Sequence, residues 1–235
     1  MRALFIVLRL AGAAVVAAAI IGQFLYSMEY RAERGIAENG IPVVNFFSFF
    51  TIDSNVLTVV ILLVGAVLLI RGSSVDPLGY GVARAAVTAY MTTTGIVYNT
   101  LLRGVELDGA TLWWSNEILH VVGPALMVVD WLFAPGRRRL EWKNIWIIVI
   151  FPIVWALYTM VRGPFVVDPT LAYLFPEYEI GWYPYPFLNP DTSAQGYVSV
   201  AFYIVLIAVV IGLVGAAVIW ASRRRDRWPL PAAKG

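Results

Sequence analysis

Long apolar segments separated by short polar connections run through the whole chain. A helix needs about 20 mostly apolar residues to cross the hydrocarbon core of a bilayer. Six segments meet this requirement, each bounded by Gly, Pro, charged residues or the aromatic residues typical of membrane interfaces. They are residues 3–26, 44–70, 80–102, 111–133, 142–165 and 197–222. The pattern predicts an all-α fold, a single six-transmembrane-helix bundle over residues 1–235 with a basic tail at residues 223–235.

Composition agrees with this pattern and narrows the class of protein. Hydrophobic residues make up 60% of the chain and charged residues 14%, whereas about a quarter of a soluble domain is charged. A water-soluble globular enzyme is therefore excluded. The chain has no Cys, which excludes disulfides, thiolate metal sites and cysteine nucleophiles. The first apolar run continues to Tyr26, longer than a signal-peptide core, so we expect an uncleaved first span.

Basic residues are distributed unequally between the two sides of such a bundle. When six spans are threaded with alternating connections, all but four of the 17 Lys and Arg residues fall on the side of both termini. The exceptions are Arg31, Arg34, Arg103 and Arg162, accompanied by the acidic residues Glu29, Glu33, Glu38, Glu106, Asp108, Asp168, Glu177, Glu179 and Asp191. Because Lys-rich and Arg-rich loops remain in the cytoplasm, we predict a multi-pass protein of the cell membrane with cytoplasmic N- and C-termini. The lipid bilayer accounts for the basic charge, and no nucleic-acid partner is expected.

The longest connection, residues 166–196, contains the run GWYPYPFLNP. Pro and aromatic residues at this density do not continue a helix. The run indicates a segment at the membrane interface, either a lid over the bundle or a rigid cap, and its role stays open.

Polar residues inside the second span lie on one helical face. Thr51, Ser54, Asn55 and Thr58 recur at i, i+3, i+4 and i+7, a spacing that aligns side chains on an α-helix. Asp53 points elsewhere. Polar side chains within hydrocarbon need a partner or water, so this face indicates a candidate site.

The fourth span carries a second polar group at a similar depth. Asn116 and His120 share a face, Glu117 lies one turn before the histidine, and Pro124 favours a kink. At 1.5 Å per residue, Thr51 and His120 lie about 10 and 13 Å below the outer boundary. The third and fifth spans bring further polar residues to the same outer half: Tyr98, Asn99, Tyr158, Thr159 and Arg162.

His120 is the only histidine in the chain. Histidine exchanges protons near neutral pH, and a hydroxyl becomes a good nucleophile when a neighbouring base removes its proton. Asn116, Glu117 or Asp53 would orient the ring, and preorganised donors would stabilise an oxyanion. Candidate donors are Arg162, Asn55 and Asn99. The alternative is that these residues only form hydrogen bonds between helices, worth about 1 kcal/mol each.

Metal chemistry is not favoured by the sequence. The Glu117-x-x-His120 spacing occurs once, whereas di-iron bundles use it twice together with two further Glu residues. We therefore expect no metal and no cofactor. Asp130, nearer the cytoplasmic end, is expected to form an ion pair, with Arg84 as a candidate partner.

Five blocks of sequence resemble a bacterial family of six-span membrane proteins sometimes labelled permeases. The blocks are NFFSFFTIDSN, GIVYNTLLRG, NEILHVVGPALMVVDW, YTMVRGPF and GWYPYPFLNP. More distantly, the chain is similar to the androgen-induced and FAR-17a-like membrane proteins, which are threonine hydrolases of fatty acid esters of hydroxy fatty acids. That resemblance implies that Thr51 corresponds to the nucleophile and His120 to its partner. The surrounding Asp53, Ser54, Asn55 and Glu117 do not match those enzymes clearly.

Taken together, the sequence predicts an integral membrane hydrolase that cleaves a membrane lipid ester. Thr51 is the expected nucleophile and His120 the expected base, with Tyr158 and Arg162 among the groups that orient or bind substrate. Ser54 lies on the same helical face and is a rival nucleophile. Two alternatives stay open, namely a transporter of a small solute and a non-catalytic membrane protein with a buried polar cavity. The oligomeric state is not predicted.

Overall fold

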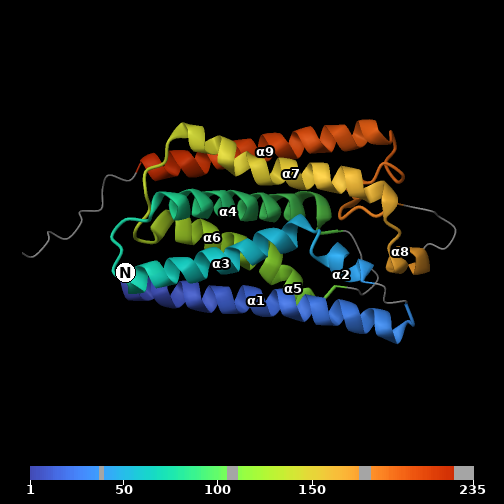
Figure 1. The fold of residues 1–235 in the computed structure, drawn as a ribbon, viewed down its shortest axis with the longest axis horizontal. Helices are drawn as coiled ribbons and strands as arrows, with labels where there is room; N and C mark the ends of the chain where they lie inside the picture. Colours follow the sequence, from blue (N-terminus) through green and yellow to red (C-terminus); the bar gives the residue numbers. More distant parts are fainter. Residues whose placement is uncertain (37–39, 105–110, 175–180, 225–235) are drawn as a thin grey trace, which may run out of the picture.

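The computed structural model describes residues 1–36, 40–104, 111–174 and 181–224, and all regular secondary structure among them is helical. The helices run roughly along the long axis of the molecule (Figure 1). They are α1 (Arg2–Glu33), α2 (Ile41–Phe46), α3 (Phe50–Ile70), α4 (Leu78–Val97), α5 (Trp113–Glu117), α6 (Gly123–Phe133), α7 (Ile145–Arg162), α8 (Pro169–Leu174) and α9 (Tyr197–Arg223). Short π-helical segments, η1 (Tyr98–Leu102) and η2 (Ile118–Val122), extend α4 and join α5 to α6, while η3 (Trp142–Asn144), η4 (Gly163–Phe165) and η5 (Pro186–Leu188) are 3₁₀ turns.

Five helices of the described part of the chain are long and apolar enough to cross a membrane, which suggests a membrane protein. They are Arg2–Glu33, Phe50–Ile70, Trp113–Phe133, Trp142–Phe165 and Tyr197–Arg223, and they correspond to five of the six predicted spans. The remaining predicted span, residues 80–102, is helical in α4 and η1 but more polar in composition. Most side chains of α4 are buried, so this helix faces protein on nearly every side and needs less apolar surface.

Some boundaries differ from the sequence prediction. Helix α1 continues to Glu33 instead of ending near Tyr26. The predicted span 44–70 begins within α2, and the chain then turns at residues 47–49 before α3 starts at Phe50. Several predicted charges lie outside the described residues, namely Glu38, Glu106, Asp108, Glu177, Glu179 and the basic tail from residue 225 onward.

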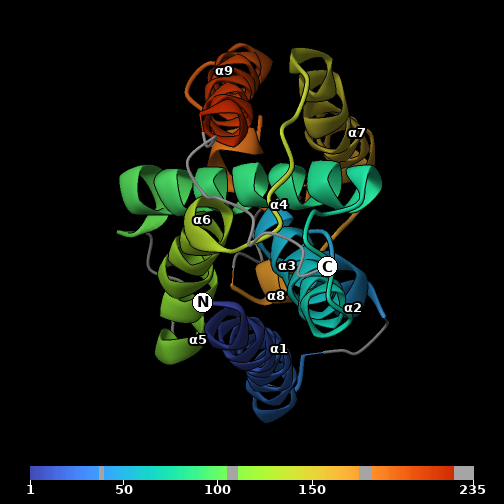
Figure 2. The ribbon, with the colours of Figure 1, turned by 90° about the vertical axis from the view of Figure 1, so that its left-hand side faces the viewer.

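Helix α4 occupies the centre of the bundle. Figure 2 shows it crossing obliquely between the α7 and α9 pair on one side and α1, α3 and α6 on the other. It packs against α3, α6, α7 and α9, while α1 packs mainly on α3. The apolar core contains residues of α3, α4, α6, α7 and α9 that meet around α4, including Leu62, Met91, Met127, Ile148 and Ile219. The two sides of the bundle are thus held together through α4.

Four charged side chains form a buried ionic cluster near one end of α4. Asp130 of α6 accepts from Arg9 Nε of α1 at 2.7 Å and from Arg84 Nε of α4 at 2.7 Å. Arg84 also donates to Asp76, in the connection before α4, at 2.9 Å. All four residues are at most 2% exposed. Two positive and two negative charges therefore balance one another inside the bundle, and the predicted pairing of Asp130 with Arg84 is confirmed.

The ionic cluster requires the helices to approach closely at Gly65. Arg9 donates to the Gly65 carbonyl at 2.7 Å, and Tyr80 donates to Ile61 on the preceding turn of α3. A Cβ atom on Gly65 would overlap the Tyr80 hydroxyl and lie 2.6 Å from Arg9 Nη1. Only glycine leaves room for the guanidinium here, so α1, α3 and α4 meet at this position.

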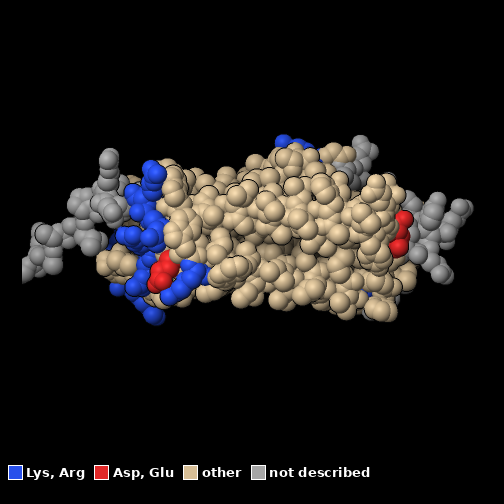
Figure 3. Space-filling view, turned by 90° about the horizontal axis from the view of Figure 1, so that it is seen from above, with Lys and Arg blue, Asp and Glu red and all other residues tan. Residues whose placement is uncertain are grey.

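Basic residues gather at the end of the molecule where α1 begins and α9 ends (Figure 3). Arg2 donates to the Leu69 carbonyl near the end of α3, and Arg223 donates to the Leu140 carbonyl before η3. The charge asymmetry expected from the sequence is therefore present along the long axis. The connection 181–196 and helices α2 and α8 lie at the other end (Figure 1).

The ionic cluster predicts a large stability loss for Asp130→Asn. Removing this carboxylate leaves Arg9 and Arg84 with one carboxylate between them, and breaking such a buried pair costs about 3–5 kcal/mol. The measurement is denaturant unfolding of the purified protein in detergent micelles. Glu141→Gln is the control, because its ion pair with Lys143 is exposed and glutamine keeps the side-chain oxygen that caps η3. The unfolding midpoint of this variant is expected to be unchanged.

The double variant Arg9→Met with Asp130→Leu keeps the Arg84–Asp76 pair and removes one charge of each sign. It is expected to be more stable than Asp130→Asn, because no charge is left in excess. A double variant as unstable as the single one would show that charge balance does not account for the loss.

Candidate functional site

His120 lies in an irregular turn of the helix that links α5 to α6. Pro124 has no N–H group and cannot donate to the carbonyl of His120 four residues earlier, and the chain adopts the π-helical segment η2 at this point. The second π-helical segment, η1, begins at Tyr98. Such single π-turns occur frequently at functional sites. Here the two turns carry a pair of aromatic rings that stack on each other, Tyr98 and His120, with ring centroids 4.1 Å apart.

The imidazole of His120 contacts the hydroxyl of Thr51. The distance from Nε2 to Thr51 Oγ1 is 3.3 Å, and Nδ1 lies 2.9 Å from the carbonyl oxygen of Asn116. A carbonyl oxygen only accepts hydrogen bonds, so Nδ1 carries the proton and Nε2 of the neutral ring accepts from Thr51. The ring is therefore oriented by the backbone of Asn116 and presents its basic nitrogen to the threonine.

The ring of Tyr98 stacks on one face of the imidazole and holds the orientation of the His120 ring. The side-chain amide of Asn116 donates to the Tyr98 hydroxyl at 2.6 Å, which ties Tyr98 to the helix that carries His120. A Cβ atom at Gly95 would lie 3.1 Å from Pro124 Cβ, so the glycine permits the close approach of α4 that the stacking requires. Asn116 thus supports the imidazole through both its backbone and its side chain.

Tyr185, in the connection before α9, is a third residue in contact with Thr51, and the sequence analysis did not identify it. Its hydroxyl lies 3.1 Å from Thr51 Oγ1 and accepts from the Thr51 N–H at 3.1 Å. That N–H is free because Thr51 is in the first turn of α3, where backbone donors have no partner within the helix. The rings of Phe49 and Phe187 pack against Tyr185. The Pro- and aromatic-rich run was the signal present in the sequence, but an irregular segment has no periodicity that predicts which ring enters the bundle.

Burial raises the pKa of Tyr185 to about 12. The hydroxyl is therefore protonated at neutral pH and available as a donor. Thr51 donates its one hydroxyl proton to His120, so Tyr185 is the donor to Thr51 Oγ1, and its oxygen also accepts from the Thr51 N–H. The hydrogen bonds run in one direction, from Tyr185 through the threonine hydroxyl to the imidazole.

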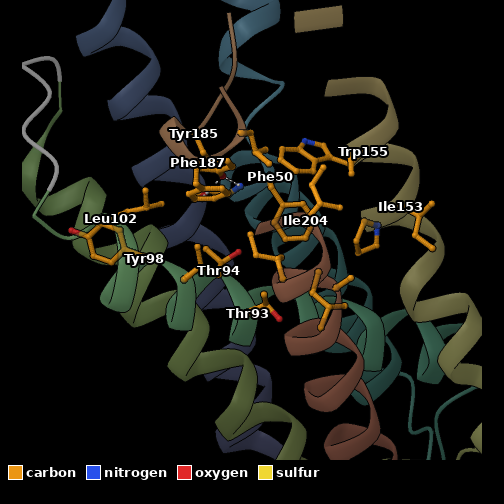
Figure 4. A pocket seen from close by; sticks show the side chains of 18 of the residues that line it. Phe50, Thr93, Thr94, Tyr98, Leu102, Ile153, Trp155, Tyr185, Phe187 and Ile204 are labelled. Carbon is orange, nitrogen blue, oxygen red and sulfur yellow. Dashed lines mark hydrogen bonds between the residues drawn. The ribbon is translucent and has the colours of Figure 1, made fainter. Parts of the chain in front are cut away.

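Thr51, His120 and Tyr185 line a cavity of about 320 Å³. Its walls come from the start of α3, the end of α4, the middle of α7 and α9, and residues 185–188. Figure 4 shows Tyr185 and Phe187 at one side, Tyr98 and Leu102 on η1, and Trp155 and Ile153 on α7. Thr93 and Thr94 add two hydroxyls from α4, and the lining along α7 and α9 is mainly apolar, with Val149, Ile153, Ile204, Ile207 and Ile211. The cavity is therefore mainly apolar and carries a small number of hydroxyl groups and one imidazole.

Ser54 and Asn55 face away from the imidazole. The hydroxyl of Ser54 donates to the Thr51 carbonyl and lies 3.3 Å from Thr94 Oγ1. The Asn55 amide donates to the carbonyls of Thr51 and Leu119, at 2.8 and 3.1 Å. Asn55 therefore joins α3 to the helix of His120 just below the site. Neither residue lines the cavity.

Glu117 and Asn99 point to the surface. Glu117 forms a fork with Arg103, both carboxylate oxygens lying 2.7 Å from Nη2, and both side chains are exposed. The exposed Asn99 donates to the Gly95 carbonyl within its own helix. Among the predicted orienting groups, the structure thus brings Asn116 to the ring and leaves Glu117 and Asn99 outside the cavity. Asp53 is half-buried and also outside the cavity lining.

Arg162 and Tyr158 belong to a separate polar cluster at the end of α7. Arg162 donates to Asn45 of α2 at 2.5 Å, and the Asn45 amide donates to Asp168 at 2.5 Å. Tyr158 contacts Ser48 at 2.9 Å. The Arg162 guanidinium also lies 5.1 Å from the centre of the Trp182 ring. None of these residues lines the cavity. The Asn45 amide, between Arg162 and Asp168, links α2 to the end of α7.

Within the described ranges there is no group of three or more His, Asp or Glu side chains that could hold a metal ion. Comparison of the chain with protein-family models, with curated proteins and with solved structures finds no match.

The cavity predicts that a thiol at position 93 is accessible and one at position 88 is not. Thr93 and Thr88 are both buried in α4, 2% and 1% exposed, but only Thr93 lines the cavity. Because the chain has no Cys, Thr93→Cys and Thr88→Cys each carry a single thiol. Methyl methanethiosulfonate is expected to modify Thr93→Cys at least about tenfold faster, since reactivity follows access. Intact-mass measurement in micelles gives the rates, and equal rates would contradict the cavity.

Proposed function

We propose that this protein is an integral membrane hydrolase that cleaves a lipid ester, with Thr51 as nucleophile and His120 as general base. The observation that carries the proposal is the 3.3 Å contact between Thr51 Oγ1 and His120 Nε2 at the wall of an apolar cavity. A nucleophile, a base and a group that orients the base are the elements of nucleophilic catalysis. The Asn116 carbonyl acts as the orienting group.

The reaction proceeds through an acyl-threonine. His120 Nε2 takes the proton of the Thr51 hydroxyl as Oγ1 bonds to the ester carbonyl carbon, and the carbonyl π electrons move to its oxygen. When this intermediate collapses, the bond to the alcohol oxygen breaks and His120 returns the proton to the alcohol. A water molecule then attacks the acyl-threonine with His120 again as base. Thr51 recovers its proton, and a fatty acid is released.

The cavity supports a lipid substrate over a polar solute. An acyl chain lying along α7 and α9 replaces apolar contacts with apolar contacts, and a pocket of about 300 Å³ is within the range of small-molecule sites. The polar solute of a transporter would find hydrogen-bonding partners at Thr51, His120 and Tyr185 and at the Thr93 and Thr94 hydroxyls of α4, but few along the α7 and α9 walls. The proposed pair is also the pair implied by the resemblance to the membrane threonine hydrolases.

The proposed topology has six spans, with α4 and η1 as the sixth, and both termini in the cytoplasm. The basic end of the bundle in Figure 3 supports this orientation, because positively charged connections remain cytoplasmic. The site then lies in the outer half of the cell membrane, next to lipid acyl chains.

Thr51→Ala is expected to reduce kcat/KM for a long-chain p-nitrophenyl ester by at least about 10³-fold, and His120→Ala by about 10²–10⁴-fold, the usual contribution of a general base. Labelling by a fluorophosphonate is expected to disappear in Thr51→Ala. Ser54→Ala is the control and is expected to retain both activities, because its hydroxyl faces Thr94. Size-exclusion chromatography of each variant checks the fold. Labelling that persists in Thr51→Ala and is lost in Ser54→Ala would move the nucleophile to Ser54.

The topology predicts opposite accessibility for thiols at the two ends of the bundle. In intact cells, a membrane-impermeant maleimide is expected to label Thr192→Cys, before α9, and not Ser74→Cys, before α4. Both positions are exposed, so the difference reports the side of the membrane. Labelling of Ser74→Cys alone would invert the proposed orientation, and labelling of both would contradict the proposed number of spans.

A further inference from the structure

Two hydrogen-bond donors flank the oxygen atom of Thr51 that would attack the ester. One is the Tyr185 hydroxyl, 3.1 Å from Thr51 Oγ1, and the other is the Thr51 N–H, which donates to that same hydroxyl. Resting on the proposed hydrolase function, we propose that Tyr185 is a further catalytic residue. Its hydroxyl and the Thr51 N–H together form the oxyanion hole.

The direction of the hydrogen bonds supports this role. Because His120 Nδ1 donates to the Asn116 carbonyl, Nε2 accepts from Thr51, and the Thr51 oxygen is left with lone pairs only. Tyr185 must then be the donor in its contact with Thr51 Oγ1. The tyrosine does not compete with His120 for the threonine proton, and it holds the oxygen in place before reaction.

Both donors become available to the substrate carbonyl oxygen as the reaction begins. When Thr51 Oγ1 bonds to the carbonyl carbon, one of its lone pairs enters the new bond and it becomes a weaker acceptor for Tyr185. The negative charge now develops on the carbonyl oxygen, one bond away. The Tyr185 O–H turns to this oxyanion, and the Thr51 N–H exchanges the tyrosine oxygen for the oxyanion. Both hydrogen bonds are therefore stronger in the transition state than in the ground state, as catalysis requires.

Tyr185 is also held rigidly enough to act in this way. Its ring is stacked on Phe187 with an interplanar angle of 5° and meets Phe49 edge-on. The ring of Trp155 lies beside it, with the two ring centres 6.0 Å apart. Arg162, Asn55 and Asn99, the donors considered from the sequence, are engaged elsewhere. In the described structure the side-chain contacts of Thr51 Oγ1 are with His120, which accepts, and with Tyr185, which is the donor.

The test is Tyr185→Phe, which keeps the ring and removes the hydroxyl. We expect kcat for a long-chain ester to fall by about 10²–10³-fold, the usual effect of removing one oxyanion donor, with KM changed by less than about threefold. Tyr183→Phe is the matched control, the same substitution two residues away at a buried tyrosine outside the cavity lining. It is expected to retain wild-type kcat.

A second measurement separates catalysis from structure. An alkyl boronic acid forms a tetrahedral anionic adduct with a catalytic hydroxyl, whereas a fatty alcohol of equal length occupies the cavity without charge. Tyr185→Phe is expected to weaken inhibition by the boronic acid at least about 30-fold and to leave inhibition by the alcohol unchanged. Equal weakening of both inhibitors would assign Tyr185 to cavity shape and overturn the proposal.

The outcomes also separate this proposal from the function on which it rests. If the wild type hydrolyses the ester and Tyr185→Phe keeps kcat within threefold, the role of Tyr185 is overturned and the roles of Thr51 and His120 stand. If the wild type neither hydrolyses long-chain esters nor reacts with a fluorophosphonate, both proposals are overturned.

Discussion

Charges that lie among apolar helices must be balanced by charges of opposite sign, and this constraint organises the bundle. Arg9, Arg84, Asp76 and Asp130 meet from α1, α4, α6 and the connection before α4. An unpaired ion at this depth would be strongly unfavourable, so each of these segments is held in register by the others. The cluster sets the lengthwise position of α4 against α6. That position determines whether Tyr98, near the far end of α4, reaches the imidazole.

At the other end of the bundle, irregular helical turns bring together side chains that regular α-helices would keep apart. The π-turns at Tyr98 and His120 rotate two side chains toward each other, and Gly95 lets the backbones approach. The backbone N–H of Thr51, in the first turn of α3, has no acceptor within the helix and donates to the Tyr185 hydroxyl. Thr51 therefore contacts groups from two distant parts of the chain, His120 and Tyr185. Rigid ionic contacts at one end support a precise polar site at the other.

Much of this arrangement follows from spacing along the sequence. Apolar length predicts the long helices, and the rise per residue places Thr51 and His120 at a similar depth, in agreement with their contact in the structure. The pairing of Asp130 with Arg84 followed from the need to neutralise a buried carboxylate. The contacts of Glu117 and Arg162 are harder to predict, because long charged side chains reach partners several ångströms from their own helix face. The contact of Tyr185 with Thr51 does not follow from the sequence, since an irregular segment has no periodicity that indicates where an aromatic ring points.

The distribution of polarity within the cavity imposes an orientation on any elongated guest. The imidazole and the Tyr185 hydroxyl lie near the start of α3, α4 adds the Thr93 and Thr94 hydroxyls, and the walls formed by α7 and α9 are mainly hydrocarbon. A molecule with one polar terminus can satisfy both environments in a single direction, head first toward Thr51 and tail between the two helices. The reverse pose would strand its polar terminus among isoleucines, so the cavity distinguishes the two ends of a chain without a charged residue in its lining.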